Sequence, residues 1–258
     1  MSLNLQARRA LLLAALALLA LPGAGAAEVT KPTIAVLSLI GDEMTLVTRR
    51  MSTGSRLDRN DRQSVPIDEP TFDVAAAVAA ERAIKEALPK AERLRMSVRD
   101  KRLFALQDGV FEPGPASDGL RQALQALLLD AKATHLLLIT KRRDVAQFRL
   151  ADSHIGDGKI EGIGIFVDNT VGLEDPVRRQ SGTGYFACYA YVKATLVDVA
   201  TMRVLGASHG SESVMTTAIG MSATNAWEAL STAGKAENLM RVADRAVYAA
   251  AREVATTL

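Results

Sequence analysis

The fold is decided by the stretch Thr33-Ile34-Ala35-Val36-Leu37-Ser38-Leu39-Ile40, an apolar run rich in β-branched residues that Gly41 and Asp42 close. A short apolar run bounded by turn residues is typical of a buried strand. A second run of this kind spans residues 134–140. Two such strands, separated by helical patterns, are typical of an α/β fold.

The segments around these two strands complete the pattern. Apolar side chains recur at helical spacing over residues 73–88 and 117–132, and over 236–256 after a helical region that begins near 224. Further strands are expected at residues 44–48, 94–98, 145–150, 160–167, 184–198 and 202–208. We therefore predict an α/β fold, α+β-like in character, with a mixed sheet that ends in an antiparallel portion and with helices mainly on one face.

The first 27 residues are expected to be a cleavable signal peptide. Arg8 and Arg9 make its start positive, residues 10–21 are all Ala or Leu, and small residues follow up to Ala27. An apolar run of about 12 residues is shorter than the roughly 20 that a membrane-spanning helix needs. Cleavage after Ala26 or Ala27 leaves a chain of about residues 28–258, which we expect to be a single periplasmic α/β domain of a bacterium.

Charge and cysteine content narrow the classes of partner. Removal of the signal peptide takes away two Arg, so 29 basic and 29 acidic side chains remain. A chain without net charge has no general attraction for nucleic acid. Cys188 is the only cysteine, so no intramolecular disulfide can form, and no cysteine at the cleavage site can carry a lipid anchor. We predict an exported protein without lipidation, nucleic-acid binding or a further membrane span.

Residues 49–70 interrupt the apolar pattern. They hold five Arg, four Asp or Glu and two Pro, with little apolar content. This composition is typical of a loop at the surface. We expect an exposed loop over 49–70, which is also a candidate contact for a partner.

Three stretches resemble a known family of periplasmic domains. They are the opening strand at residues 31–37, the end of a helix running into a strand at 131–139, and a long strand, turn and return strand at 191–205. With the order of the elements, they resemble the α/β domain shared by the amino-terminal domain of TolB, the curli secretion channel CsgG and lipoprotein activators of peptidoglycan synthases. The resemblance implies protein–protein contact or envelope assembly instead of catalysis.

The chain departs from that family in ways that limit what can be carried over. Thr201-Met202 stands in the turn where the family has Thr-Gly. The lipidated cysteine of the channel and of the synthase activators is missing, and no propeller like that of TolB follows. Neither a secretion pore nor Tol function is therefore expected.

The residues able to carry catalysis lack the spacing that the chemistry requires. The histidines, His135, His154 and His209, show no spacing typical of metal ligands. Cys188 alternates with apolar residues along a predicted strand, which favours the core over a nucleophile. Residues 156–159 are typical of a turn and lack the spacing of a phosphate-binding loop. We predict no catalytic residue, no metal and no cofactor.

One face of the predicted strand 184–198 is a candidate surface. Tyr185, Tyr189 and Tyr191 share this face with Lys193. If a helix covers this face, its side chains belong to the core. If no segment covers the face, the tyrosines form an exposed aromatic strip, which favours partner binding. We assign these four residues as the candidate partner-binding site and leave both arrangements open.

Three functions are consistent with these patterns. The leading hypothesis is a non-catalytic periplasmic adaptor or assembly protein that contacts an envelope partner through a sheet face or the long loop. The alternatives are an envelope hydrolase that gathers Asp and His from separate loops, and a protein that binds a small ligand in a crevice at the strand ends. A pocket in which His154 or His209 meets carboxylates favours the hydrolase. The partner and the oligomeric state are not identified by the sequence.

Overall fold

The computed structural model describes residues 31–258 apart from 51–57, 59, 99, 108, 112, 113, 151, 152, 176 and 221–225. The predicted signal peptide and the expected helical start near 224 lie outside the described residues. All elements below belong to the unit Pro32–Leu258.

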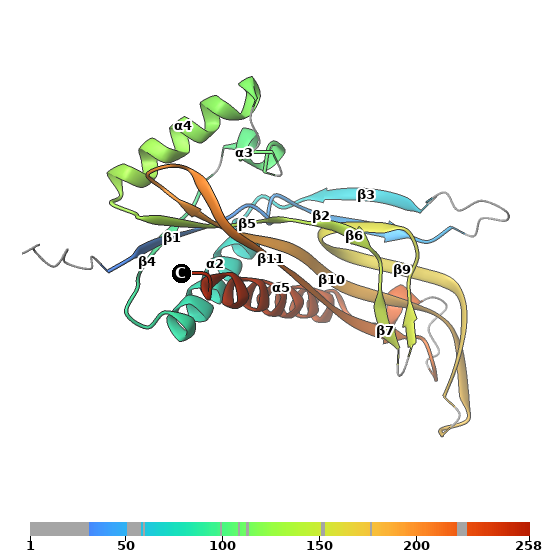
Figure 1. The fold of residues 1–258 in the computed structure, drawn as a ribbon. Coiled ribbons are helices and arrows are strands. Elements are labelled where there is room, and N and C mark those ends of the chain that lie inside the picture. The colour runs from blue at the N-terminus through green and yellow to red at the C-terminus, as the bar shows by residue number, and fades with distance from the viewer. Residues whose placement is uncertain are drawn as a thin grey trace, which may run out of the picture. The chain divides into compact units, whose positions relative to one another are not determined.

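The opening strand predicted from the sequence lies in the middle of the parallel part of the sheet. β1 (Thr33–Ser38) pairs in parallel with β4 (Glu92–Met96) on one side and with β5 (His135–Lys141) on the other. The registers place Ala35 of β1 between Leu94 and Leu136. The two apolar runs are strands, as predicted, and they lie next to each other in the sheet (Figure 1).

Nine strands among the described residues form one mixed sheet. Its main path runs β3-β2-β9-β10-β5-β1-β4, with β11 added to β10 and β6 to β9. The antiparallel portion predicted near the C-terminus is confirmed, because β10 pairs with β11 on one edge and with β9 and then β5 on the other. The other strands are β2 (Glu43–Thr48), β3 (Asp61–Pro66), β6 (Arg143–Val145), β7 (Phe148–Leu150), β8 (Ser153–Ile155), β9 (Lys159–Asp175), β10 (Gln180–Asp198) and β11 (Arg203–Thr217), of which β7 and β8 form a separate hairpin.

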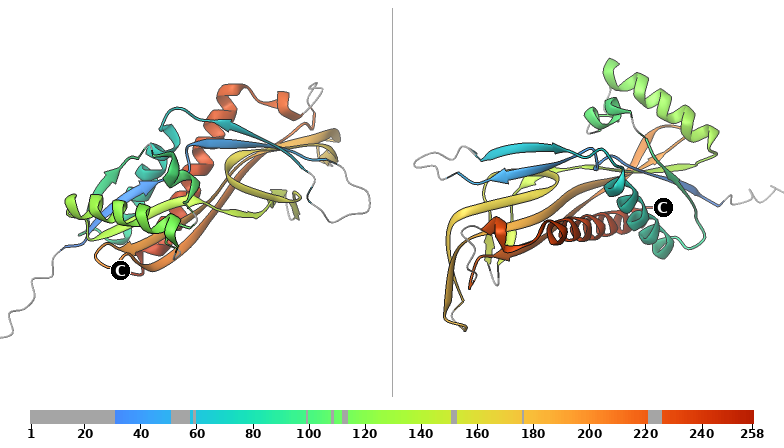
Figure 2. Two further views of the ribbon diagram at one scale, coloured as in Figure 1. Left: turned by 90° about the horizontal axis from the view of Figure 1, so that it is seen from above. Right: turned by 180° about the vertical axis from the view of Figure 1, so that it is seen from behind.

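Most of the described helical residues pack on one face of this sheet, as predicted, and two shorter helices cover the other face. The two longest described helices, α2 (Thr71–Ala87) and α5 (Thr232–Ala255), pack on the same face. α4 (Pro115–Asp130) and the short α3 (Lys101–Ala105) lie on the opposite face, over β1 and β5 (Figure 2). A 3-10 turn, η2 (Ala226–Ala229), precedes α5. No helix in the described part of the chain is long and apolar enough to cross a bilayer.

Alanine allows the layer of α2 and α5 to lie close to the sheet. The buried side of α2 is mostly alanine, and α5 adds Ala243, Ala246 and Ala250 to the same core cluster. Side chains without rotatable bonds lose no rotamer freedom on burial, so this core is assembled at low conformational cost. Larger aliphatic residues of β1 and β5, such as Val36 and Leu137, fill the space beneath the helices.

The Asp198 side chain stabilises the turn between β10 and β11. The Asp198 carboxylate accepts hydrogen bonds from the backbone N–H and the hydroxyl of Thr201, at 2.8 and 2.6 Å. Met202, which follows, has a φ of 52°, in the left-handed region that favours glycine. A glycine would adopt this backbone without the steric cost that the side chain of Met202 carries.

The structure corrects the prediction that residues 49–70 are a loop throughout. Asp61–Pro66 forms β3, which pairs with β2 at an edge of the sheet. Most side chains of β3 are exposed, because an edge strand takes backbone partners from one neighbour and does not require an apolar face. Residues 51–57 and 59 of the predicted loop lie outside the described residues. The strand expected at 145–150 is likewise divided between β6 and β7.

Candidate functional site

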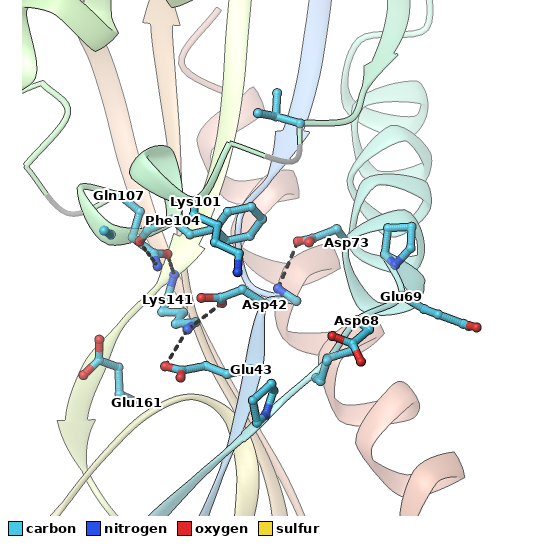
Figure 3. Close-up of a pocket in the computed structure, with 16 residues that line it drawn as sticks. Asp42, Glu43, Asp68, Glu69, Asp73, Lys101, Phe104, Gln107, Lys141 and Glu161 are labelled. Carbon is cyan, nitrogen blue, oxygen red and sulfur yellow. Dashed lines mark hydrogen bonds and ion pairs between the residues drawn. The ribbon is translucent and has the colours of Figure 1, made fainter.

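The order of the parallel strands places a crevice at their carboxyl ends. From β1 the chain passes through β2, β3 and then α2 on one face before it reaches β4, and from β4 it reaches β5 through α3 and α4 on the other face. Connections that leave to opposite faces separate at the strand ends, which is where open α/β sheets bind ligands. A cleft of about 720 Å³ lies there, between the loop after β1, the end of β5, the start of α2 and α3 (Figure 3).

Asp73, in the first turn of α2, fixes the shape of the loop after β1. One carboxylate oxygen accepts hydrogen bonds from the Ser38 hydroxyl at 2.7 Å and from the backbone N–H groups of Ile40 and Gly41 at 2.9 and 3.1 Å. Burial raises the pKa of Asp73 above its usual range, although these hydrogen bonds oppose the shift. Gly41 is required here, since a Cβ would lie 2.7 Å from the second oxygen of Asp73.

Lys141, the last residue of β5, holds a buried ammonium group at one side of the cleft. Its Nζ lies 2.6 Å from Asp42 and 3.1 Å from Glu43, and its side chain is 8% exposed. A hydrogen bond from Ser64 and the contact with Lys141 hold the pKa of Glu43 below its usual range against the effect of burial. The aliphatic stem of Lys141 lies over Gly162, where a Cβ would come within 2.9 Å of it.

The rest of the cleft combines carboxylates with an apolar wall. Asp68, Glu69 and Glu161 line it and form no ion pair with any described residue. Figure 3 shows Glu161 on one side of the Lys141 group and Asp68 and Glu69 on the other. Ile67 and Phe104 supply apolar surface. The sequence predicts a crevice at the strand ends but does not identify the residues that line it, because those residues are far apart in the chain.

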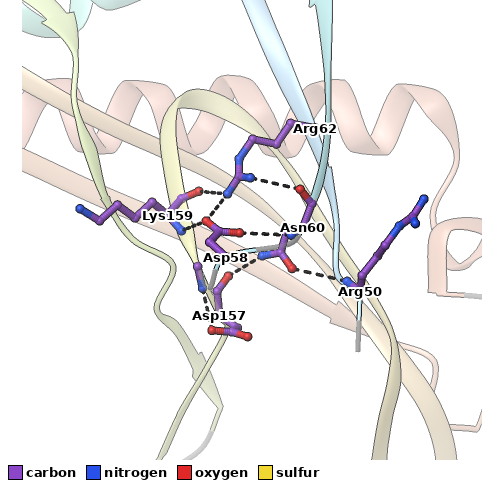
Figure 4. A network of polar contacts seen from close by, with 7 residues as sticks. Arg50, Asp58, Asn60, Arg62, Asp157 and Lys159 are labelled. Carbon is purple, nitrogen blue, oxygen red and sulfur yellow. Dashed lines mark hydrogen bonds and ion pairs between the residues drawn. The ribbon is translucent and has the colours of Figure 1, made fainter. Parts of the chain in front are cut away.

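A second polar cluster fixes the segment before β3 to the turn before β9. The Asp58 carboxylate accepts hydrogen bonds from the backbone N–H of Lys159 at 2.9 Å, from Asn60 N–H at 3.2 Å and from Arg62 (Figure 4). These bonds outweigh burial and lower the pKa of Asp58. Gly158 has a φ of 77°, and a Cβ there would lie 2.6 Å from the Asp58 carboxyl carbon. Residues 156–158 connect β8 to β9, and Lys159 begins β9. The predicted turn is therefore a connection between two strands that do not pair with each other.

Replacement of Asp58 by alanine is expected to lower the free energy of unfolding by about 1 to 2 kcal/mol, because three donors lose their acceptor. Urea denaturation followed by circular dichroism measures the change. Asp61→Ala is the matched control: its pair with Arg50 has both side chains more than half exposed, and we expect a loss of about 0.5 kcal/mol or less. Equal losses in the two variants would contradict an anchoring role for Asp58.

The tyrosine face of β10 is not an exposed strip. Tyr185 and Tyr189 are fully buried, and Tyr191 is 4% exposed. The cover is not a helix: Phe148 of β7 packs over the face, with its ring centroid 6.2 Å from that of Tyr185 and 5.1 Å from that of Phe166 in β9. Burial raises the pKa of all three tyrosine hydroxyls. Only Lys193 of the four predicted residues reaches the surface, and it is half-buried.

The histidines lie on three different strands. His135 begins β5, is half-buried, and has its Nδ1 2.8 Å from the Thr134 hydroxyl. His154 and His209 are exposed. His154 shares a small cleft of about 260 Å³ with Asp144, but the Asp144 carboxylate is engaged by Arg142. Among the described residues, no group of three or more His, Cys, Asp or Glu is placed to hold a metal ion.

Cys188 is a core residue, as its alternation predicts. It is fully buried, and its thiol donates to the backbone carbonyl of Lys235 at 3.7 Å. Burial raises its pKa to about 11, so the reactive thiolate is disfavoured at neutral pH.

Comparisons with known proteins show only distant structural similarity. No family model matches the chain, and no curated protein matches it in sequence. A PelC dodecamer from Paraburkholderia phytofirmans superposes with a TM-score of 0.35 at 9% identity, covering 88% of each chain. XCC0632 from Xanthomonas campestris has a TM-score of 0.34 at 11% identity, covering 88% of this chain and 82% of its own.

A putative neuraminyllactose-binding hemagglutinin homolog from Helicobacter pylori has a TM-score of 0.35 at 7% identity, covering 88% of this chain and 85% of its own.

Proposed function

We propose that the mature chain acts in the bacterial periplasm as a non-catalytic adaptor or assembly protein, and that it binds its envelope partner in the cleft at the carboxyl ends of β1 and β5. Export is supported by the basic start, the apolar run and the small residues of positions 1–27. The stretches that resemble the TolB and CsgG domains support a role in protein–protein contact.

The position of the cleft carries the proposal. It lies at the carboxyl ends of the parallel strands, with α2 on one face and the α3 and α4 connection that follows β4 on the other, at the kind of site that open α/β sheets use for ligands. Its walls are held by contacts between distant segments, such as that of Asp73 with Ser38 and that of Lys141 with Asp42. A cleft braced in this way keeps its shape before a partner arrives, which reduces the ordering cost of binding.

A second candidate function, the binding of a small ligand, is favoured by the size of the same cleft. Its volume of about 720 Å³ falls within the range of about 300 to 1,000 Å³ that is usual for small-molecule sites. Two experiments distinguish these functions. An adaptor retains a protein from a periplasmic extract when the chain is immobilised. A ligand-binding protein releases a small molecule when the purified chain is denatured.

Filling the cleft with a bulky neutral side chain tests the proposal. Ala105 is an exposed residue of the cleft wall, so Ala105→Trp obstructs the cleft without a change of charge. We expect capture of a periplasmic partner by the immobilised mature chain to fall at least tenfold. Quantitative mass spectrometry of the retained proteins measures it.

Ala126→Trp is the matched control, since Ala126 is exposed on α4 and does not line the cleft. We expect it to retain the partner at the wild-type level. Equal retention by Ala105→Trp would count against the cleft as the binding site. Amino-terminal sequencing of the periplasmic protein checks export, with Ala27 or Glu28 as the expected first residue.

A further inference from the structure

β11 forms an edge of the sheet that is less protected than the edges at β3 and β4. Among the described residues its only strand partner is β10, so one side of β11 has no backbone partner there (Figure 1). β3 is exposed and charged and ends in Pro66, and three of the five residues of β4 are charged. Short length, charge and proline hinder the addition of a further strand. β11 from Gly206 to Thr217 has no proline and one permanently charged residue, Glu212.

The hydrogen bonds of β10 show which backbone groups of β11 are free. The Arg142 N–H donates to the carbonyl of Tyr191 at 3.0 Å, so the main chain of Tyr191 is turned toward β5. Tyr191 is opposite Ser211, and opposite residues of an antiparallel pair exchange either both hydrogen bonds or neither. Ser211 therefore turns its N–H and C=O away from β10. The same direction applies to every second residue of this regular stretch, namely Ala207, His209 and Ser213.

These free groups match themselves under a two-fold rotation. The pairing of β11 with β10 continues without a bulge from Gly206 to Thr217. An axis through Gly210, the middle residue of Arg203–Thr217, lets two antiparallel copies of β11 overlap over the whole strand. Residues at equal distances on either side of Gly210 are then opposite each other, so outward donors meet outward acceptors. The pairs are Ala207 with Ser213 and His209 with Ser211 of the second copy.

The side chains of β11 are compatible with this register. Glu212 comes opposite Ser208, and Val214 comes opposite Gly206, so neither two carboxylates nor two large side chains are directly opposed. An axis through Glu212 would instead set two carboxylates opposite each other. Charge and size therefore favour an axis at Gly210 over one at Glu212.

Helix α5 leaves room for a second copy. It packs on both β10 and β11, and the Ser208 hydroxyl donates to Glu253 at 2.6 Å, so Glu253 marks the flank of α5 over β11. Ala249 lies one turn away on the same flank and is exposed. Strands about 4.8 Å apart place two copies of α5, each over its own β10 and β11, about 10 Å apart. Packed helices lie about 8 to 10 Å apart, so the two copies of α5 fit side by side.

We propose that the mature chain forms a two-fold dimer in which the β11 strands of two copies pair antiparallel about Gly210, so that one sheet runs through both copies. Four outward residues on each strand provide about eight backbone hydrogen bonds between the copies. None of the described residues that line the cleft at the ends of β1 and β5 belongs to β11. The dimer is therefore independent of the proposed function, and Ala105→Trp should leave it intact.

Removal of one outward N–H tests the interface. Sedimentation velocity of the purified mature chain gives the mass, and a monomer at about 0.1 mM would overturn the inference. Ser211→Pro removes the outward N–H and leaves the bonds between β11 and β10 in place, so we expect the dimer to weaken roughly tenfold or more. Ser211→Ala is the control, because it keeps the N–H and loses only the contact of the hydroxyl with Arg142. We expect Ser211→Ala to remain dimeric, and a dimer of equal strength in Ser211→Pro would overturn the inference.

A pair of double variants tests the register without removing a hydrogen bond. With the axis at Gly210, residue 207 of each copy is opposite residue 213 of the other. Ala207→Lys/Ser213→Lys therefore opposes like charges twice, and Ala207→Lys/Ser213→Glu opposes unlike charges twice. We expect the first variant to dissociate at a concentration roughly tenfold higher or more than the second, with a difference that shrinks as salt is added. Equal dissociation of the two variants would overturn the inference.

Overall charge needs a control of its own, because the two double variants differ in net charge. Ala123→Lys/Ala126→Lys adds the same positive charge at exposed positions of α4, away from β11. We expect this variant to dimerise within about twofold of the wild type, since well-separated exposed charges are screened. A loss equal to that of Ala207→Lys/Ser213→Lys would indicate general repulsion and overturn the inference.

Discussion

Replacement of Gly210 by alanine is expected to destabilise the protein by about 3 kcal/mol or more, at the upper end of the range for overpacked cores. Gly210 lies on β11 directly beneath α5. A Cβ at this position would overlap the carbonyl oxygen of Ala246 and lie 2.7 Å from its carbonyl carbon. Both are backbone atoms, so a change of rotamer cannot relieve the overlap, and α5 would have to move away from the sheet.

The expected change in Gly210→Ala is measured by urea denaturation of the purified mature chain. A displaced α5 separates alanine and valine side chains from β10 and β11, so the loss appears as a lower midpoint with a similar slope. Gly119→Ala is the matched control, because Gly119 is in helix α4 and a Cβ there meets no atom within 4 Å. We expect Gly119→Ala to stabilise the protein by about 0.5 to 1 kcal/mol. An unchanged midpoint for Gly210→Ala would show that α5 does not lie this close to the sheet.

The fold could be predicted from the sequence where local pattern and burial agree. Residues 33–40 and 134–140 are apolar on both strand faces, and the structure covers both faces with helices. The spacing over residues 73–88 predicts a helix with a contact face of Val74, Val78, Ile84 and alanines. α2 confirms the helix and buries Ile84 and the alanines, but Val74 and Val78 lie at the surface. β3 was not predicted from the sequence. An edge strand that pairs with one neighbour can be polar, so its sequence shows no pattern of apolar residues.

The cleft and the cover of the tyrosine face could not be predicted, because both depend on contacts between distant residues. Lys141 meets Asp42 across nearly a hundred residues, and only the strand order brings the two together. Tyr185 is buried by Phe148, which belongs to a short hairpin that carries no strong pattern of its own. The alternation of side chains along β10 identifies which residues share a face, but it does not show which segment of the chain covers that face.

Removal of the Asp168 carboxylate is expected to have the second large effect on stability. Asp168 is fully buried on β9, where one oxygen accepts from Arg49 at 2.7 Å and the other from the Thr170 N–H and hydroxyl at 2.8 and 2.6 Å. Loss of one partner of a buried ion pair costs about 3 to 5 kcal/mol. Arg49 is 28% exposed and stays partly solvated, so we expect a smaller loss of about 2 to 3 kcal/mol for Asp168→Ala.

The pH dependence of stability gives Asp168 a distinct signature. Burial opposes ionisation of this carboxyl, but the hydrogen bonds from Thr170 and Arg49 outweigh it and hold its pKa below the ordinary value. A group whose pKa is lower in the folded state contributes fully above its unfolded pKa of about 3.9, and the contribution is lost as pH falls through the folded value. The difference in unfolding free energy between wild type and Asp168→Asn should therefore be constant from about pH 7 to 5 and shrink below about pH 4.

Urea midpoints collected for both proteins between neutral and acidic pH test this expectation. Asp118→Asn is the control, because Asp118 pairs with Arg121 at the surface of α4, and its removal should leave the pH profile close to that of the wild type. A wild-type advantage over Asp168→Asn that persists unchanged at the lowest pH would show that the carboxylate charge does not provide the stability. The Arg49 pair would then contribute through shape alone, and the link between β9 and the end of β2 would not depend on pH.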